Sequence, residues 1–209
     1  MLNKFLRGVV TRIINRPARA LISMGVSPNA LTVTGFFLLV GACGLIATGR
    51  LVEGGWALLV AGAFDLFDGA VAKLGGKASK RGAFLDSTLD RLSDAMLFGA
   101  IIWQFLKMPP SLPPDSVLYQ FPEFANGAQT GGAALAFGAL VLGFLVSYIK
   151  ARAEGLGMDC NVGVAERAER IVLPALGLVF DQLIPALVIL VALSAVTAVQ
   201  RFVHVWKQA

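Results

Sequence analysis

Four aspartates in the first half of the chain have the spacing of a metal site. Asp65 and Asp68 are three residues apart, and Asp86 and Asp90 are four residues apart. On a helix, both spacings place two carboxylates on one face. Each pair lies at the end of a long apolar segment, and a short basic loop over 74–81 joins the two segments. A hairpin of two helices would therefore bring the four carboxylates together at one depth.

Four anions at one place require a positive partner, because they repel one another strongly in surroundings of low dielectric constant. Ligation by oxygen alone favours Mg²⁺ or Mn²⁺. Four carboxylates are enough to hold two such ions, about 3.5–4 Å apart, and Asp65, Asp68 and Asp86 are the natural ligands. The alternative is that the aspartates are ordinary charges at helix ends facing water. The apolar sequence around them argues against it.

The composition is that of a membrane protein. Of the 209 residues, 56% are hydrophobic, and the mean hydropathy is +0.74, which is too apolar for a soluble domain of this size. The net charge of +5 would suggest a nucleic-acid partner in a soluble protein. In a membrane protein the distribution of charge matters more, and we predict no nucleic-acid partner. Cys43 and Cys160 indicate neither a disulfide nor a metal site.

Six apolar segments predict an all-α integral membrane protein with six transmembrane helices, all in one domain over residues 26–209. The segments run over 29–48, 56–73, 82–106, 131–149, 170–180 and 184–200. The fifth is short, so its helix should begin near Val164. Prolines predict an irregular loop over 107–130. Residues 1–25 are basic and amphipathic and predict a juxtamembrane helix on the membrane surface, although a mitochondrial-type targeting peptide has similar chemistry.

The basic residues predict the orientation of these spans. With six spans, both termini lie on one side, and sixteen of the 18 Lys and Arg residues fall on that side together with the aspartates. Only Arg50 and Lys107 fall on the other side. By the positive-inside rule, the termini and the aspartate cluster face the cytoplasm. The sequence therefore predicts a multi-pass protein of the cell membrane whose site opens to the cytoplasm.

The aspartate stretch resembles the signature of the CDP-alcohol phosphotransferase family, D-x2-D-G-x2-A-R-x8-G-x3-D-x3-D. The matching positions are Asp65, Asp68, Gly69, Ala72, Gly82, Asp86 and Asp90. Lys73 departs from the signature, which has Arg at that position. In that family the motif binds a CDP-linked lipid and two metal ions. The resemblance implies that Asp90 is both a metal ligand and the general base that takes the proton from the acceptor hydroxyl.

The resemblance also implies contacts with the CDP-linked lipid. The family positions that contact it correspond here to Asn29, Ala30, Leu31, Thr32 and Ser79. Gly69 leaves room for a phosphate or nucleotide to approach the helix. Lys73 would meet the phosphates as a point charge where Arg would offer a two-pronged contact. From the residues alone, a capped helix start and a plain loop serine explain 29–32 and Ser79 nearly as well.

A second group of polar and basic residues lies at the same level as the aspartates. Its members are Ser147, Lys150, Arg152, Arg170 and Arg201. Several cations beside a metal site favour a second, phosphorylated substrate. Charges that set the topology and attract anionic headgroups are the alternative. The stretches S-Y-I-K-A-R-A-E, E-R-A-E-R and V-Q-R resemble an actinobacterial branch of the family, which implies phosphatidyl transfer from CDP-diacylglycerol to inositol 1-phosphate, bound through these residues.

Two rival functions and one assembly state stay open at this point. A branch of the family with the same aspartates uses glycerol 3-phosphate as the acceptor. A divalent-cation transporter would need a polar route across the membrane, and the outer halves of the predicted spans carry almost no ionisable groups. The resemblance implies a homodimer in the membrane, which the small residues Gly41, Gly44, Gly62 and Gly99 permit.

Overall fold

The computed structural model describes residues 14–107 and 128–208. This part of the chain is all-helical, with seven helices and no strand. A helix over 14–23 comes first. The others are α2 (Pro28–Ala47), α3 (Leu51–Leu74), α4 (Lys80–Lys107), α6 (Ala128–Gly155), α7 (Arg167–Val179) and α8 (Leu183–Trp206). The six predicted apolar segments are all helices, and most of the predicted loop over 107–130 lies outside the described residues.

Local signals explain where the helices begin and end. The hydroxyl oxygen of Ser27 accepts a hydrogen bond from the backbone N–H of Ala30 (3.2 Å), and Pro28 occupies the first turn, where its missing N–H is not needed. Gly49, with φ 87°, ends the turn after α2. α3 then begins at Leu51, five residues before the predicted start, and Arg50 pairs with Glu53 at 3.1 Å in its first turn.

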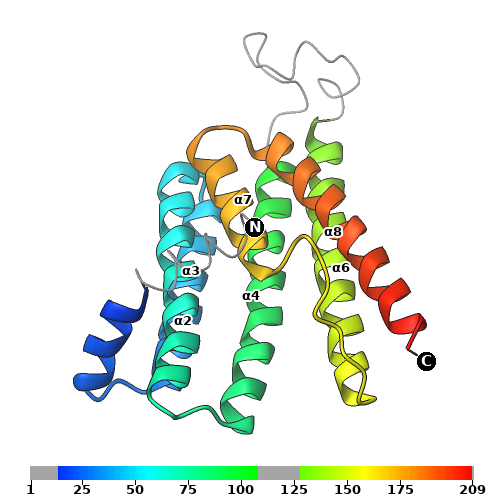
Figure 1. Ribbon diagram of the computed structural model, residues 1–209. Helices are drawn as coiled ribbons and strands as arrows, with labels where there is room; N and C mark the ends of the chain where they lie inside the picture. Colours follow the sequence, from blue (N-terminus) through cyan, green and yellow to red (C-terminus); the bar gives the residue numbers. More distant parts are fainter. Residues whose placement is uncertain (1–13, 108–127, 209) are drawn as a thin grey trace.

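Consecutive long helices run alternately up and down the bundle (Figure 1). α2 packs against both α3 and α4, α4 against α6, α6 against α8, and α7 against α3 and α8. The core between them is apolar and holds Leu58, Phe98, Ile101, Leu187 and Leu190, each fully buried. Because α2 packs against both aspartate-bearing helices, it also contributes to the site that they form.

α7 is short because the chain reaches it along an extended path. After α6, residues 156–166 climb beside the bundle, and α7 begins about halfway along its height (Figure 1). Thr197 of α8 holds this segment, since its hydroxyl oxygen accepts hydrogen bonds from the N–H groups of Val164 (3.2 Å) and Ala165 (2.9 Å). The helix predicted to begin near Val164 therefore begins at Arg167, which places that residue deep in the bundle.

The described part of the N-terminal segment docks on the bundle. Ala18 is fully buried and packs with Leu31 of α2 and Val71 of α3. The helix predicted over 1–25 is present over 14–23, and residues 1–13 lie outside the described residues. This helix lies at the same end of the bundle as the 75–79 turn and the end of α6 (Figure 1).

Three helices of the described part are long and apolar enough to cross a membrane. They are α2, α6 and α8. α3 and α4 are as long but carry the charged residues of the site, and α7 has only 13 residues. Composition alone therefore marks three spans, because the charges that carry the chemistry lower the hydropathy of the other helices.

We expect Gly55→Ala to destabilise the protein. A Cβ at Gly55 would lie 2.8 Å from the carbonyl oxygen of Ala175 and 2.8 Å from a methyl group of Val179, so α3 and α7 would have to separate. Overpacking of this kind costs about 1–3 kcal/mol. Thermal unfolding in detergent measures it. Gly138→Ala on α6 is the matched control, because among the described residues the nearest atom to the added methyl group is a methyl carbon of Val191 at an ordinary contact distance of 3.9 Å, and it should leave the midpoint unchanged or raise it. Equal midpoints for the two variants would contradict the close packing of α3 on α7.

Candidate active site

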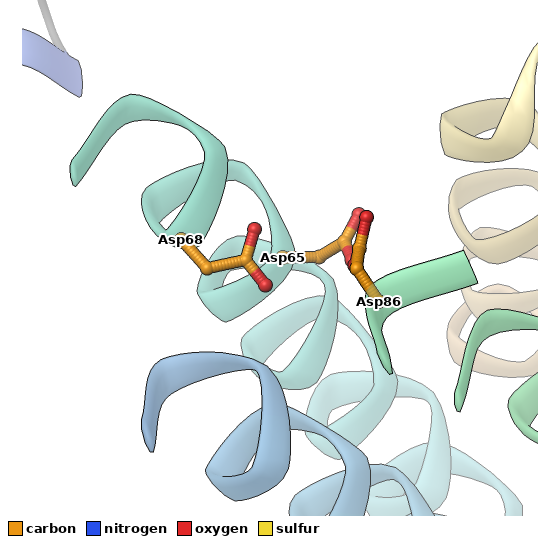
Figure 2. Close-up of side chains that lie close together, drawn as sticks. All are labelled: Asp65, Asp68 and Asp86. Atoms are coloured by element: carbon orange, nitrogen blue, oxygen red, sulfur yellow. The ribbon is translucent and has the colours of Figure 1, made fainter. Parts of the chain in front are cut away.

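Three of the predicted aspartates converge. Asp65 and Asp68 lie on α3 and Asp86 lies on α4, and one carboxylate oxygen from each lies within 4.8 Å of the others. Figure 2 shows the three side chains pointing toward one another. Thr32 of α2 donates a hydrogen bond to Asp68 Oδ2 at 2.7 Å. The site is thus assembled from three helices, and α2 orients one of its carboxylates.

The three carboxylates fit a divalent cation. They offer only oxygen ligands, which Mg²⁺ and Mn²⁺ prefer. Asp68 is buried, with 7% of its surface exposed. Asp86 Oδ1 is buried as well, and none of the described residues donates a hydrogen bond to it. A buried carboxylate oxygen without a donor is costly, and a bound cation would remove that cost.

Asp90 lies one turn along α4 from Asp86 and has positively charged neighbours. Its Oδ1 lies 2.8 Å from Nη2 of Arg167 in an ion pair whose geometry falls short of a hydrogen bond. Arg91 is 3.6 Å from its other oxygen. Asp94, one further turn along, pairs with Arg91 (3.7 Å) and Arg170 (3.5 Å) and is therefore a structural partner of basic groups.

A pocket opens beside Asp68 and Asp86 toward the 75–79 turn. Four residues predicted to contact the CDP-linked lipid line it: Asn29, Thr32, Gly69 and Ser79. No atom of the described residues lies within 4 Å of the place that a Cβ at Gly69 would take, so the described residues leave the helix surface open there. Ala30, Leu31 and Lys73 do not line this pocket, and Leu31 is buried in the core. The sequence reasoning missed Lys77, which does line it.

A second pocket opens on the other side of Asp90. Its volume is about 340 Å³, far above the roughly 10–15 Å³ that one water needs. Four of the residues predicted for the acceptor line it: Ser147, Lys150, Arg170 and Arg201. Arg152 is exposed and does not line it. Four further charged residues line it that were not among the predicted site residues: Arg91, Glu154, Glu166 and Arg167.

Two arginines of this pocket are anchored to the backbone. Arg170 donates hydrogen bonds to the carbonyl oxygen of Gly143 (2.7 Å) and to the hydroxyl of Ser147 (3.3 Å). Arg201 donates to the carbonyl oxygens of Val146 and Val162, both at 2.9 Å. Both arginines are at most 6% exposed. Their charges are therefore fixed in position before any anion binds, which lowers the entropic cost of binding one.

Arg167 is the residue that sequence reasoning most clearly missed. It lines the second pocket, and its guanidinium pairs with both Asp65 and Asp90. The available signal was its spacing of three residues from Arg170 in the E-R-A-E-R stretch, which places both side chains on one face of a helix.

The fold and the site define a lipid-modifying membrane enzyme, and the chain belongs to the CDP-alcohol phosphatidyltransferase family, whose sequence model matches residues 25–207. The chain is 36% identical to an archaetidylinositol phosphate synthase of Methanothermobacter thermautotrophicus, over 100% of this chain and 95% of that protein. It is also 36% identical to a phosphatidylinositol phosphate synthase of Corynebacterium glutamicum, over 93% and 84% of the two chains.

Solved structures show the same fold. A crystal structure of Mycobacterium tuberculosis phosphatidylinositol phosphate synthase with CDP-DAG bound superposes with a TM-score of 0.73 at 28% identity, covering 93% of this chain and 94% of that one. A second crystal structure of that enzyme, in complex with manganese and citrate, gives a TM-score of 0.72 at 28% identity, covering 92% and 88%. The predicted family membership is confirmed.

Proposed function

We propose that the protein is a phosphatidylinositol-phosphate synthase, which transfers the phosphatidyl group from CDP-diacylglycerol to inositol 1-phosphate and releases CMP. The observation that carries this proposal is the cationic pocket that Asp90 lines, which is separate from the pocket that Asn29, Gly69 and Ser79 line beside Asp68 and Asp86. Two substrates can therefore meet at the carboxylates, each from its own pocket. The relatives named above share inositol phosphate in their names.

In this reaction an acceptor hydroxyl oxygen attacks the phosphorus that carries diacylglycerol, and the bond from that phosphorus to the CMP oxygen breaks. Asp90 takes the hydroxyl proton as general base. Asp65, Asp68, Asp86 and Asp90 would hold two divalent ions, Mg²⁺ or Mn²⁺, which would supply positive charge against the pyrophosphate and the departing CMP.

The donor pocket suits a nucleotide-linked pyrophosphate. Thr32 fixes Asp68, and the open surface at Gly69 allows phosphate oxygens close to α3. Lys77 lines the pocket and would add a positive charge to the phosphates. Ala30 and Leu31 belong to the proposal only as family positions that contact the CDP-linked lipid, and Lys73 only as the residue at the position where the signature has Arg.

The acceptor pocket suits a phosphorylated polyol. Arg170 and Arg201 present fixed positive charges to a phosphate. Glu154 and Glu166 line the same pocket, and carboxylates accept hydrogen bonds from hydroxyl groups. A phosphorylated ring with several hydroxyls can bind the arginines through its phosphate and the glutamates through its hydroxyls. Glycerol 3-phosphate offers fewer hydroxyls to the glutamates. The pocket therefore favours inositol 1-phosphate over glycerol 3-phosphate.

An acceptor screen tests the proposal. Purified protein with CDP-diacylglycerol and Mg²⁺ or Mn²⁺ is given inositol 1-phosphate, glycerol 3-phosphate or unphosphorylated inositol, and CMP release is measured. Inositol 1-phosphate should have the highest kcat/KM. A higher kcat/KM for glycerol 3-phosphate would contradict the proposal and would show that the protein belongs to the branch of the family that uses glycerol 3-phosphate. Because the relatives' names differ in their lipid part, a CDP-linked ether lipid is included as a second donor.

We also propose that all six predicted apolar segments cross the cell membrane, the fifth as the short α7 together with the extended segment 156–166 before it, with both termini and the site on the cytoplasmic side. The basic helix over 14–23 and the basic 75–79 turn lie at one end of the bundle, while Arg50 and Lys107 lie at the other end. Labelling of single cysteines introduced at Gly49 and Gly76 tests this. Labelling of residue 49 from the cytoplasm would contradict it.

We further propose a homodimer. No described residue comes within 4 Å of a Cβ placed at Gly41, Gly44 or Gly99, so these helix surfaces leave room for a second copy. Gly62 instead faces Ile171 within the chain. Helices in membranes associate through such small residues. Light scattering of the detergent-solubilised protein measures its mass, and a monomer would contradict the proposal.

A pair of lysine and arginine variants tests the acceptor pocket. We expect Lys150→Ala to raise the KM for inositol 1-phosphate about tenfold to hundredfold, since a charge-assisted contact contributes about 1.5–3 kcal/mol. The KM for CDP-diacylglycerol should not change. Lys150 lines the pocket and has only an exposed 3.9 Å pair with Glu154, so the fold should tolerate its loss.

Arg152→Ala is the matched control, because Arg152 is two residues away, equally basic and outside the pocket. Steady-state kinetics with each substrate varied separately measure both variants. If Arg152→Ala raises the acceptor KM as much as Lys150→Ala, Arg152 also binds the acceptor, as the sequence predicts, and the acceptor site extends beyond the pocket. If both variants weaken both substrates equally, the cations attract headgroups and do not bind the acceptor.

A further inference from the structure

Arg167 connects the two halves of the active site. Its guanidinium pairs with Asp65 through Nη1 and lies 2.8 Å from Asp90 through Nη2. The same residue lines the acceptor pocket and also a small pocket of about 20 Å³ that includes Asp68. One side chain thus faces a carboxylate of the metal site, the proposed base and the acceptor pocket.

The pair with Asp65 conflicts with metal binding. Asp65 is one of the three carboxylates that could hold a cation, and Arg167 already neutralises it. A divalent ion and a guanidinium that share one carboxylate repel each other, and at about 4 Å the repulsion is several kcal/mol per unit charge at an effective dielectric constant of 20. The guanidinium must therefore move away from Asp65 when a cation is bound there.

The Arg167 side chain can move from Asp65 into the acceptor pocket. The backbone under Arg167 is held because Thr197 accepts hydrogen bonds from Val164 and Ala165. Arg170 is fixed by the carbonyl oxygen of Gly143. Arg167 makes no comparable contact, because its described side-chain partners are the two carboxylates and its Nε is buried without a partner among the described residues. Rotation of its long side chain would bring the charge into the acceptor pocket that it already lines.

We propose that Arg167 is a positioning residue that couples cation binding to acceptor binding. Its guanidinium changes ion-pair partners, leaving Asp65 and Asp90 and pairing with the acceptor phosphate. The inference rests on the proposed function, since the phosphate is that of the acceptor. Cation binding releases the guanidinium from Asp65, and the released charge strengthens the phosphate site. By linkage, the acceptor phosphate draws Arg167 away and raises the affinity for the cation by the same factor. The exchange also frees Asp90 to accept a proton.

The test measures the affinity for Mn²⁺, with electron paramagnetic resonance of the free ion as the readout and no turnover required. In wild-type protein without CDP-lipid, inositol 1-phosphate should raise the Mn²⁺ affinity at least about fivefold, the lower end of typical coupling between sites. In Arg167→Gln the affinity without acceptor should already be at least about fivefold above wild type, because the competing charge is gone. The acceptor should then raise it little further.

Arg91→Gln is the matched control. It removes one positive charge beside Asp90, at 3.6 Å, without any pair to Asp65. Because Arg91 also lines the acceptor pocket, inositol 1-phosphate is supplied at saturation for this variant. Arg91→Gln should raise the Mn²⁺ affinity less than Arg167→Gln, and the saturating acceptor should still raise it further. Thermal unfolding of each variant shows whether it is folded. The effect of inositol 1-phosphate on the Mn²⁺ affinity of the wild-type protein tests the coupling even if a variant does not fold.

Three outcomes would overturn the coupling. The first is a Mn²⁺ affinity in Arg167→Gln that is unchanged or weaker, which would mean that Arg167 orients Asp65 as a ligand. The second is equal tightening in Arg91→Gln, which would reflect general electrostatics. The third is a wild-type affinity that does not respond to an acceptor that is turned over. If inositol 1-phosphate is not turned over, the proposed function fails, and the acceptor-free comparison of the variants still decides whether Arg167 competes with the cation.

Discussion

Replacement of Asp65, Asp68 or Asp86 by asparagine is expected to abolish phosphatidyl transfer, with a loss of about a thousandfold or more in kcat/KM. The three carboxylates lie within 4.8 Å of one another and act as one ligand group, so removal of one charge impairs the whole group. Asparagine has nearly the same shape, and Thr32 can still donate to the amide oxygen at position 68. The loss should therefore appear in Mn²⁺ binding and CMP release, and the unfolding temperature should change little.

Glu53→Gln is the control for this series. Glu53 lies on α3, the helix of Asp65 and Asp68, but at its opposite end and exposed, where its ion-pair partner among the described residues is Arg50. Its replacement should leave CMP release unchanged. Near-normal turnover in any one of the three asparagine variants, at ordinary metal concentrations, would remove that residue from the metal site.

Replacement of Asp90 by asparagine is expected to lower kcat by about a hundredfold to ten-thousandfold, the usual contribution of a general base, while CDP-diacylglycerol still binds. Asp90 is outside the group of three converging carboxylates, so that group remains to hold a cation beside the donor pocket. Single-turnover rates at saturating substrate, together with equilibrium binding of the lipid, separate the two effects.

The structure adds a condition to this second experiment. Asp90 pairs with Arg167 and Arg91, so its loss leaves two buried or half-buried positive charges with fewer partners, and the unfolding temperature must be measured alongside the rate. A variant that loses lipid and Mn²⁺ binding but keeps its rate at saturation would show that Asp90 is only a ligand. The base would then have to be another group.

Much of the site was predictable because it rests on helical spacing. Asp65 and Asp68 share a face of α3 whatever α3 packs against. The gathering of Asn29, Gly69 and Ser79 in one pocket was predicted from the resemblance to the family, whose membership the family model confirms. The start of α3 at Leu51 was missed because two glycines, at 54 and 55, read as a turn. They are instead the places where α3 lies close to α2 and α7.

By itself the sequence determined which segments are helical, the pairing of carboxylates along single helices, the basic end of the bundle and the family. These are properties of local spacing and composition. The tertiary structure decided which residues meet across helices. It placed Lys77 in the donor pocket and left Lys73 outside, and it left Arg152 outside the acceptor pocket. It brought Arg167 to Asp65 across 102 positions of the chain. Such contacts depend on the height along the bundle at which Thr197 holds the irregular segment 156–166. No periodicity in the sequence encodes that height.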